Sequence, residues 1–147
     1  MSARARFLVC EDGEEYTARF QRFLGAEFEF ERVDHFAAAL ARAPGARGLL
    51  LDLDFRRTPA ALLVDETGAL GPARLAEVQG ILLLRALRAH GVSLPALLFA
   101  DLDDPGRAAR LEAELAPLTV VSSSEGLPRI AQRLRAMVLA AAPEDGD

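Results

Sequence analysis

Apolar and polar residues form two alternating patterns along the chain. Continuous apolar runs at 7–10, 48–53, 96–100 and 118–121 are typical of strands, and so is the alternation of apolar and charged residues at 27–32. Apolar residues at helical spacing occupy the stretches between them, at 14–24, 35–42, 73–90, 104–115 and about 126–141. Five strands that alternate with five helices predict an α/β fold with a doubly wound parallel sheet in the strand order 2-1-3-4-5.

The same pattern predicts one domain over residues 1–141, interrupted by one insertion. A chain of 147 residues of which 51% are apolar has enough material for a single core. Residues 55–72 are too long for a normal strand-to-helix connection, and we expect a small hairpin or an extra turn within them. This insertion forms a lid, a partner-binding surface or a disordered segment. A disordered tail is predicted at 142–147.

Residues at the predicted helix ends support these boundaries. Gly25 and Gly91 follow helical stretches and are expected to stop them. Asp34 precedes the second helical stretch and is expected to cap it. Asp104 and Pro105 have the order of an N-cap and a first helical residue.

Charge and residue composition narrow the function. The formal net charge is −5 and no basic run occurs, which argues against direct nucleic-acid binding. The single cysteine, Cys10, excludes an internal disulfide, and the N-terminus becomes charged too early for a signal peptide. No apolar stretch approaches the roughly 20 residues that span a bilayer. We therefore expect a cytoplasmic protein with no membrane span.

Acidic residues follow three of the predicted strands. Glu11 and Asp12 end the first strand and Asp52 ends the third, while Asp101 comes directly after the fourth. These side chains should lie near one another, because the carboxyl ends of parallel strands meet at one edge of a sheet. Clustered carboxylates bind a hard cation or have raised pKa values. Helix N-termini also favour acidic residues, which is the simpler explanation of the same positions.

Four segments of the chain resemble receiver domains of two-component response regulators. In order, they resemble the family's first strand, its strand ending in the phosphoacceptor aspartate, its third helix and its fourth strand. The segments are residues 7–12, 49–53, 78–88 and 94–100. The resemblance implies the flavodoxin-like receiver fold. It also implies that Asp52 accepts a phosphoryl group and that Glu11, Asp12 and Asp52 hold Mg²⁺, which we expect to bind weakly.

The positions that would sense phosphorylation in that family are changed here. The family's lysine is replaced by a serine, a hydroxyl residue by alanine, and a switch aromatic by threonine or valine. These degenerate switch positions are Ser122 or Ser123, Ala100, and Thr119 or Val120. No lysine stands elsewhere, because all 17 residues counted as lysine or arginine are arginine, and the loss of a cation near developing charge costs several kcal/mol. Arg56 or Arg57 could replace the lysine, or both are solvated loop residues.

Three functions are compatible with these residues. The first is an atypical, pseudo-receiver signalling domain, not an enzyme, that acts by protein–protein interaction with phosphoacceptor chemistry impaired or absent. The second is a working receiver that is phosphorylated at Asp52 in a histidine-kinase phosphorelay. The third is a metal-dependent small-molecule binder or enzyme on the same scaffold, which is disfavoured because no catalytic motif accompanies the carboxylates.

The predicted partner surface consists of the helix at 104–115, the strand at 118–121 and the last helix. The partner is another protein, a histidine kinase or a second copy of the chain, and the family often uses this face. The charged residues expected to project from it are Arg107, Arg110, Glu114, Arg129, Arg133 and Arg135. Arginine suits bidentate contacts with carboxylates on a partner. An ordinary charged helix surface explains these arginines equally well, and the insertion at 55–72 is a second candidate surface.

Overall fold

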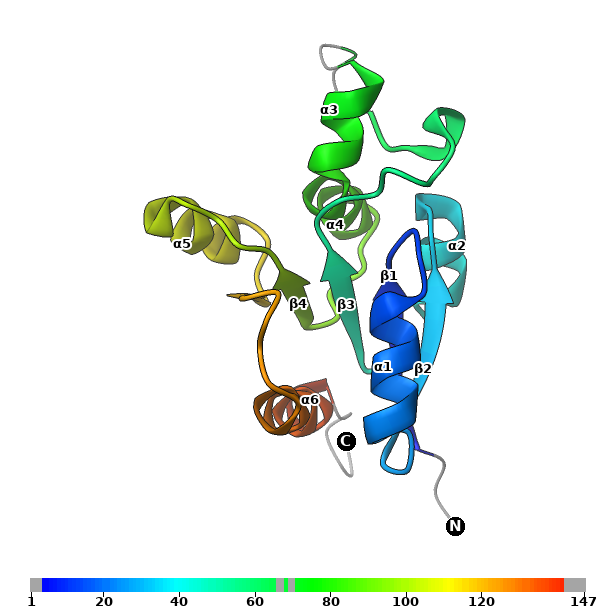
Figure 1. Cartoon of the computed structure of the whole chain (residues 1–147), viewed down its shortest axis with the longest axis vertical. Coiled ribbons are helices and arrows are strands. Elements are labelled where there is room, and N and C mark those ends of the chain that lie inside the picture. Colours follow the sequence, from blue (N-terminus) through cyan, green and yellow to red (C-terminus); the bar gives the residue numbers. More distant parts are fainter. Residues whose placement is uncertain (1–3, 66–67, 69–70, 142–147) are drawn as a thin grey trace.

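Five parallel strands form one sheet in the order β2-β1-β3-β4-β5 (Figure 1), which confirms the predicted strand order. The structure is a computed structural model that describes residues 4–65, 68 and 71–141. The strands are β1 (Ala5–Cys10), β2 (Phe28–Val33), β3 (Gly48–Asp52), β4 (Ala96–Phe99) and β5 (Leu118–Val121). The predicted tail at 142–147 and part of the insertion lie outside the described residues.

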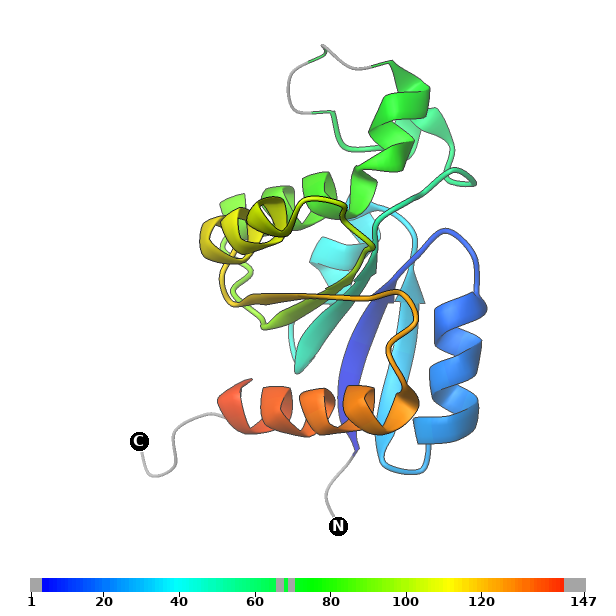
Figure 2. The same cartoon turned by 60° about the vertical axis from the view of Figure 1, so that its left-hand side comes forward.

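Helices cover both faces of the sheet (Figure 2), as in the flavodoxin-like fold that the sequence predicts. Helices α2, α4 and α5 pack on one face, and α1 and α6 pack on the other. The helices are α1 (Glu15–Leu24), α2 (Phe36–Arg42), α3 (Pro72–Glu77), α4 (Gln79–Ala89), α5 (Pro105–Glu114) and α6 (Leu127–Ala141), with a short 3₁₀ helix η1 (Ala60–Leu62). None of the helices described is long and apolar enough to cross a membrane.

Strand β1 shows how one apolar run supports both layers. Leu8 and Cys10 belong to the core beneath α2, α4 and α5, whereas Phe7 and Val9 belong to the core beneath α1 and α6. Successive side chains of a strand point to opposite faces, so a strand covered on both sides is apolar at every position. All four side chains are 1% exposed or less. Burial of Phe7, Leu8 and Val9 contributes about 1.5–3 kcal/mol each to folding.

The single helix predicted over 73–90 is wrong. The chain forms two helices there, with Val78 between them at φ −121° and ψ 16°. The N–H of Gly80 donates to the carbonyl oxygen of Leu53 at 2.9 Å, and a β-carbon on Gly80 would lie 2.1 Å from the carbonyl oxygen of Asp52. Helix α4 therefore begins in contact with the end of β3, while α3 turns away with the insertion (Figure 2).

One predicted helix cap is confirmed and one is wrong. Asp104 caps α5, and its side chain accepts a hydrogen bond from the N–H of Gly106 at 2.9 Å. Asp34 does not cap α2, because the N-cap residue is His35. Asp34 instead places its Oδ1 atom 2.8 Å from Nδ1 of His35.

Arg88 joins α4 to the loops at the amino ends of β4 and β5. Its guanidinium donates to the carbonyl oxygens of Val92, Leu94, Leu115 and Pro117 at 2.7–3.0 Å. Burial lowers the pKa of this arginine. The carbonyl acceptors replace the water that the half-buried guanidinium has lost.

Candidate functional site

The strand register brings the ends of three strands together. Leu51 pairs with Cys10 and Asp52 pairs with Phe99, so β1, β3 and β4 end at the same edge of the sheet. Several carboxylates follow these strands, and we call them the acidic edge: Glu11, Asp12, Asp52, Asp54 and Asp101. The prediction that acidic residues meet at the strand ends therefore holds for the backbone, but their side chains have different surroundings.

Glu11 points into the protein and stabilises α1. Its side chain is 1% exposed and accepts hydrogen bonds from the N–H of Tyr16 at 3.1 Å and from the N–H and hydroxyl of Thr17 at 2.7 and 2.6 Å. Glu14, the N-cap residue of α1, makes no side-chain cap. A carboxylate at a helix N-terminus satisfies free N–H groups and interacts favourably with the helix dipole. Both oxygens of Glu11 are used in this way.

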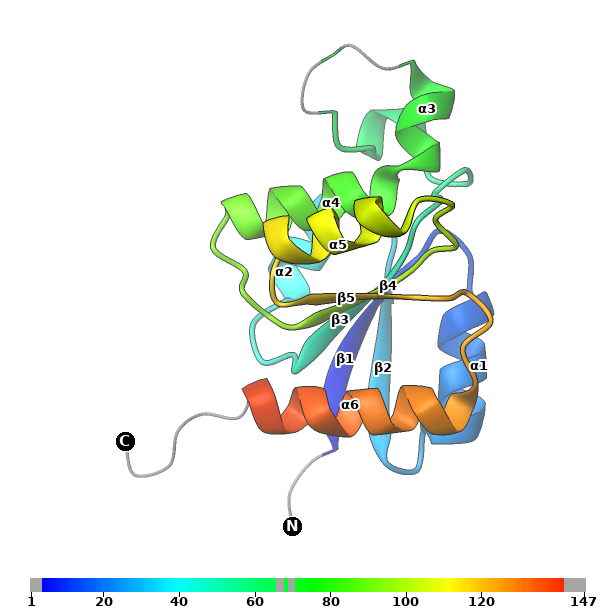
Figure 3. The ribbon, with the colours of Figure 1, turned by 90° about the vertical axis from the view of Figure 1, so that its left-hand side faces the viewer.

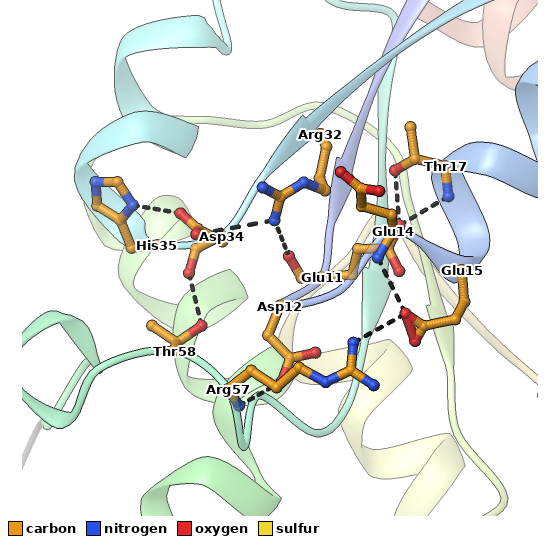
Figure 4. A network of polar contacts seen from close by, with 10 residues as sticks. All are labelled: Glu11, Asp12, Glu14, Glu15, Thr17, Arg32, Asp34, His35, Arg57 and Thr58. Atoms are coloured by element: carbon orange, nitrogen blue, oxygen red, sulfur yellow. Dashed lines mark hydrogen bonds and ion pairs between the residues drawn. The ribbon is translucent and has the colours of Figure 1, made fainter.

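Asp12 faces the segment that follows β3 (Figure 4). Its Oδ2 atom accepts the N–H of Arg57 at 2.6 Å, and the Arg57 guanidinium donates to Glu15 at 3.1 Å. Arg56, the neighbouring arginine, pairs with Asp54 at 2.7 Å. Both arginines thus contact carboxylates at or beside the acidic edge, and none of their described contacts is with the side chain of Asp52.

Asp52 lies half-buried at the end of β3, and its protonation is strongly perturbed. Burial is the largest cause of a rise in its pKa from 3.8 to about 6, and neighbouring negative charges add to that rise. The charges belong to Asp12, Glu11 and Asp54. The N–H of Leu53, which donates to Oδ1 of Asp52 at 2.9 Å, acts in the opposite direction. Among the described residues, no cation is paired with this carboxylate.

Tyr16 brings a phenol to the acidic edge. Its ring stacks on Phe99, with ring centroids 4.9 Å apart and 25° between the planes. Burial is the first cause that raises the pKa of Tyr16 to about 12, followed by the charges of Asp52, Asp101 and Glu11. The phenol therefore stays protonated and is a hydrogen-bond donor at neutral pH.

Asp101 is held by serines at the ends of β4 and β5. Its Oδ1 atom accepts the hydroxyl of Ser122 at 3.0 Å and the N–H of Ser123 at 3.1 Å, and its Oδ2 atom accepts the Ser123 hydroxyl. These bonds, led by that of the Ser123 hydroxyl, lower the pKa of Asp101. Ala100 beside it is 6% exposed and has no hydroxyl. An anion bonded to serines thus lies directly beside the positions where the resemblance places a hydroxyl residue and a lysine.

Thr119 and Val120, the candidates for the switch position, lie half-buried in β5. The N–H of Val120 donates to Glu112 of α5 at 2.8 Å. This bond satisfies a backbone group on the open edge of the sheet, where unpaired N–H groups would otherwise accept another strand. The β5 edge is therefore partly closed by a side chain of the same molecule.

The described residues do not fit the three-carboxylate Mg²⁺ site that the resemblance implies. Among them, no group of three or more histidine, cysteine, aspartate or glutamate side chains is arranged to hold a metal ion. Glu11 is bonded to α1, and Asp12 shares an oxygen with the N–H of Arg57. Asp52 shares an oxygen with the N–H of Leu53. Mg²⁺ demands near-octahedral oxygen ligands, which this arrangement does not supply.

The arginines of the predicted partner surface divide into two groups. Helix α5, strand β5 and helix α6 lie together at one edge of the molecule (Figure 3). The ion pairs on and around them are Arg110–Asp104 at 3.3 Å, Arg133–Glu125 at 2.7 Å, Arg135–Glu27 at 2.7 Å and Arg85–Glu114 at 2.6 Å. Arg107 and Arg129 are exposed and make no ion pair with any other described residue.

The described part of the insertion is bonded to α3 and α4. Gln79, which is 2% exposed, accepts the N–H of Val64 at 2.7 Å and donates to the carbonyl oxygens of Val64 and Leu75. The extra turn predicted for this region is η1, and the described residues of the insertion contain no strand. An open cavity of about 430 Å³ is lined by Arg56, Thr58, Ala60, Leu63, Ala73 and Glu77, among others.

Solved structures have the same fold. The receiver domain of the Francisella response regulator 1452 matches with a TM-score of 0.69 and 12% identity, over 93% of this chain and 98% of that chain. The signal receiver domain of a signal transduction histidine kinase from Syntrophus aciditrophicus matches with a TM-score of 0.67 and 14% identity, over 97% and 96%. An adenylate cyclase structure from Rhodopirellula baltica matches with a TM-score of 0.65 and 12% identity, over 95% and 90%.

The chain therefore has the fold of response-regulator receiver domains, as its sequence resemblance implies. No protein-family model and no curated protein sequence matches it. At 12–14% identity the likeness establishes the fold. A shared fold does not define the chemistry of a site, which depends on the side chains of the acidic edge.

Sequence reasoning misses Tyr16 as a residue of the site, and it names Glu11 without its inward role. The helical pattern assigns Tyr16 only to the buried side of α1, although its place in the first turn after Glu11 and Asp12 is a signal for the site. The inward role of Glu11 has a weaker signal, because it depends on free N–H groups at Tyr16 and Thr17 that only the folded backbone brings within reach.

Proposed function

We propose that the chain is an atypical receiver domain, a pseudo-receiver, that signals through protein–protein contact without a phosphoryl group on Asp52. The observation that best supports this proposal is that the carboxylate of Asp101 accepts hydrogen bonds from Ser122 and Ser123. A phosphoryl group on Asp52 would need a cation and a hydroxyl at this end of the sheet, because its charge must be offset by fixed groups. Asp101 supplies negative charge in their place.

The charges around Asp52 support the same proposal. Its neighbours Asp12, Glu11 and Asp54 already raise its pKa by repulsion. A phosphoryl group would add more negative charge to this region, and repulsion from nearby carboxylates disfavours it. The nearest arginines of the insertion, Arg56 and Arg57, pair with Asp54 and Glu15.

The expected partners and cofactors follow from these residues. We expect no catalysis, because receiver-type folds usually carry none. Mg²⁺ is expected to bind weakly, since Glu11 is bonded to α1. The partner is a protein, a histidine kinase or a second copy of the chain, and we expect the domain to work in the cytoplasm.

A functional phosphoacceptor is the second candidate. One observation favours it: Asp52 ends β3 and is only partly buried, and among the described residues its side chain is hydrogen-bonded through Oδ1 alone. A metal-dependent enzyme is less favoured, because no group of three candidate ligands is found in the described part of the chain.

Intact mass after treatment with acetyl phosphate and Mg²⁺ tests the proposed function. A receiver domain that has its lysine and hydroxyl residue is treated in parallel as the positive control. We expect that control to gain a phosphoryl group and this chain to remain unmodified, as its Asp52→Asn variant does. Stoichiometric phosphorylation that is lost in Asp52→Asn would refute the pseudo-receiver proposal and favour the second candidate.

A further inference from the structure

The backbone after β3 crosses the acidic edge and is fixed on both sides of Arg57. We call residues 54–58 the strap. Phe55 is fully buried, and its N–H donates to the carbonyl oxygen of Ala76 at 2.8 Å. Thr58 is 7% exposed, and its hydroxyl donates to the carbonyl oxygen of Asp34 at 3.1 Å. Arg57 lies between these two anchors, so its position does not depend on its own side chain.

Arg57 contacts the acidic edge with its backbone and a carboxylate beside that edge with its side chain (Figure 4). The N–H donates to Asp12 at 2.6 Å, and the guanidinium donates to Glu15 at 3.1 Å. The pKa of Arg57 is raised, first by the bond to Glu15 and its charge, and then by the charge of Asp12 and of Glu11. The guanidinium therefore lies in the negative field of the carboxylates that follow β1.

Gly13 has no side chain, and this leaves room for the ends of the Arg57 and Glu15 side chains. A β-carbon at Gly13 would lie 2.3 Å from Nη1 of Arg57 and 2.1 Å from Oε1 of Glu15. No strained backbone conformation requires glycine here, because only Gly45, Gly68 and Gly91 have positive φ among the described glycines. The glycine after Asp12 is thus explained by the close approach of the Arg57–Glu15 ion pair.

We infer that the strap is an internal substitute for the metal ion of this fold: the backbone N–H of Arg57 occupies Asp12, and the guanidinium, paired with Glu15, places a positive charge beside the acidic edge that opposes Mg²⁺ binding. The inference rests on the proposed function, since it gives the reason why a domain of this fold works without a bound cation. A guanidinium on a tethered strap neutralises carboxylates without demanding octahedral oxygen ligands.

A titration with MgCl₂ at low ionic strength, followed by the amide NMR signals of Asp12 and Leu53, tests this competition. The chains compared are wild type, Arg57→Ala and Arg135→Ala. Both variants remove an exposed arginine that is paired with a glutamate, but the Arg135–Glu27 pair lies at the start of β2, at the opposite end of the strands. Arg57→Ala keeps the N–H bond to Asp12 and removes only the charge, so we expect it to bind Mg²⁺ about 5- to 10-fold more tightly than wild type, and Arg135→Ala to stay within about twofold.

Gly13→Ala provides a second variant that keeps Arg57. Its methyl group would overlap the ends of both Glu15 and Arg57 and separate the pair from this position, so it should also tighten Mg²⁺ binding while the net charge is unchanged. Adding Asp12→Asn to Arg57→Ala should cancel the gain. The inference is wrong if Arg57→Ala has the same Mg²⁺ affinity as wild type, including the case where neither chain binds, or if the gain survives Asp12→Asn.

The proposed function and the strap inference fail in different measurements. Phosphorylation of wild-type Asp52, read by intact mass, refutes the pseudo-receiver proposal. Equal Mg²⁺ affinities of wild type and Arg57→Ala refute the strap and leave that proposal standing. Either hypothesis can therefore be refuted while the other stands.

Discussion

Glu11 and Asp12 are adjacent in the chain and have opposite environments. Glu11 is 1% exposed and its oxygens accept hydrogen bonds from Tyr16 and Thr17. Asp12 turns toward the strap and accepts the N–H of Arg57. One carboxylate thus stabilises the start of α1, because the first N–H groups of a helix have no hydrogen-bond partners within the helix. The other remains at the acidic edge and contributes to the repulsion that Asp52 experiences.

Asp52 is expected to destabilise the folded chain at neutral pH. Its pKa is about 6 when folded against an ordinary 3.8, so the folded state binds more protons than the unfolded state between these values. Stability therefore falls as the pH rises from about 4 to about 6, and the loss is complete above that range. Asp52→Asn should be more stable than wild type by about 1 kcal/mol at pH 7.5, after allowance for solvent screening of a half-buried group.

Urea unfolding of both chains at about pH 4 and about pH 7.5 measures this difference. The advantage of Asp52→Asn should be present at the higher pH and nearly absent at the lower one. An equal advantage at both values would mean that the raised pKa is not the cause.

Sequence reasoning finds where the acidic residues lie but not what each one contacts. The apolar runs of β1 and β3 end at Glu11 and Asp52, and parallel strands end together, so the acidic edge is predictable. The partners are not predictable, because they come from distant parts of the chain. The bond from Arg57 to Asp12 spans 45 positions in the sequence, and no local pattern at either residue indicates it.

At the scale of elements, the contact between β3 and α4 sets the geometry of the site. Gly80 donates to the carbonyl oxygen of Leu53, and its missing β-carbon leaves room for the carbonyl oxygen of Asp52. Helical periodicity continues unbroken from 73 to 90 and so predicts one helix. The break at Val78 arises because the first turn of α4 has to meet the end of β3, a constraint that lies outside the local pattern.

Gly80→Ala is expected to destabilise the protein by about 1–3 kcal/mol, since the new methyl group would overlap backbone that cannot move aside. Helix propensity alone predicts the opposite, a gain of about 1 kcal/mol for alanine over glycine. Gly106→Ala in α5 is the matched control, because the atoms near its β-carbon belong to the ends of the Asp104 and Arg110 side chains. Thermal unfolding of both variants measures the difference. A stabilised Gly80→Ala would show that α4 can move away from Asp52 without cost.

At the scale of the whole molecule, the use of arginine as the only long basic residue shapes the surface. All 17 residues counted as lysine or arginine are arginine. Arg85 bonds both oxygens of Glu114, and Arg135 bonds both oxygens of Glu27. Such two-point contacts use the planar fork of the guanidinium, which an ammonium lacks. Many arginines are therefore engaged within the molecule, and a basic residue found by sequence is not necessarily available to a partner.

Arg107 and Arg129 are the arginines of the α5–β5–α6 face best placed to bind a partner. Both are exposed and neither makes an ion pair with another described residue, whereas Arg110 and Arg133 are paired with Asp104 and Glu125. Reversing both charges, in Arg107→Glu with Arg129→Glu, should weaken binding to an acidic surface on the partner by about tenfold or more. The thermal midpoint should change by less than about 2 °C, because no internal ion pair is broken.

Capture of partner proteins from a cell lysate by the immobilised chain measures this effect, with Arg74→Glu as a charge reversal beside the insertion, where it also breaks the pair with Glu77. Arg74 lies on α3 beside the insertion, and its side chain is 64% exposed. Loss of the captured proteins in the Arg107→Glu, Arg129→Glu chain, with retention by Arg74→Glu, would assign the interface to α5, β5 and α6. If Arg74→Glu or deletion of the insertion abolishes capture while the double reversal has no effect, the interface is the insertion. The two unpaired arginines would then be an ordinary charged helix surface.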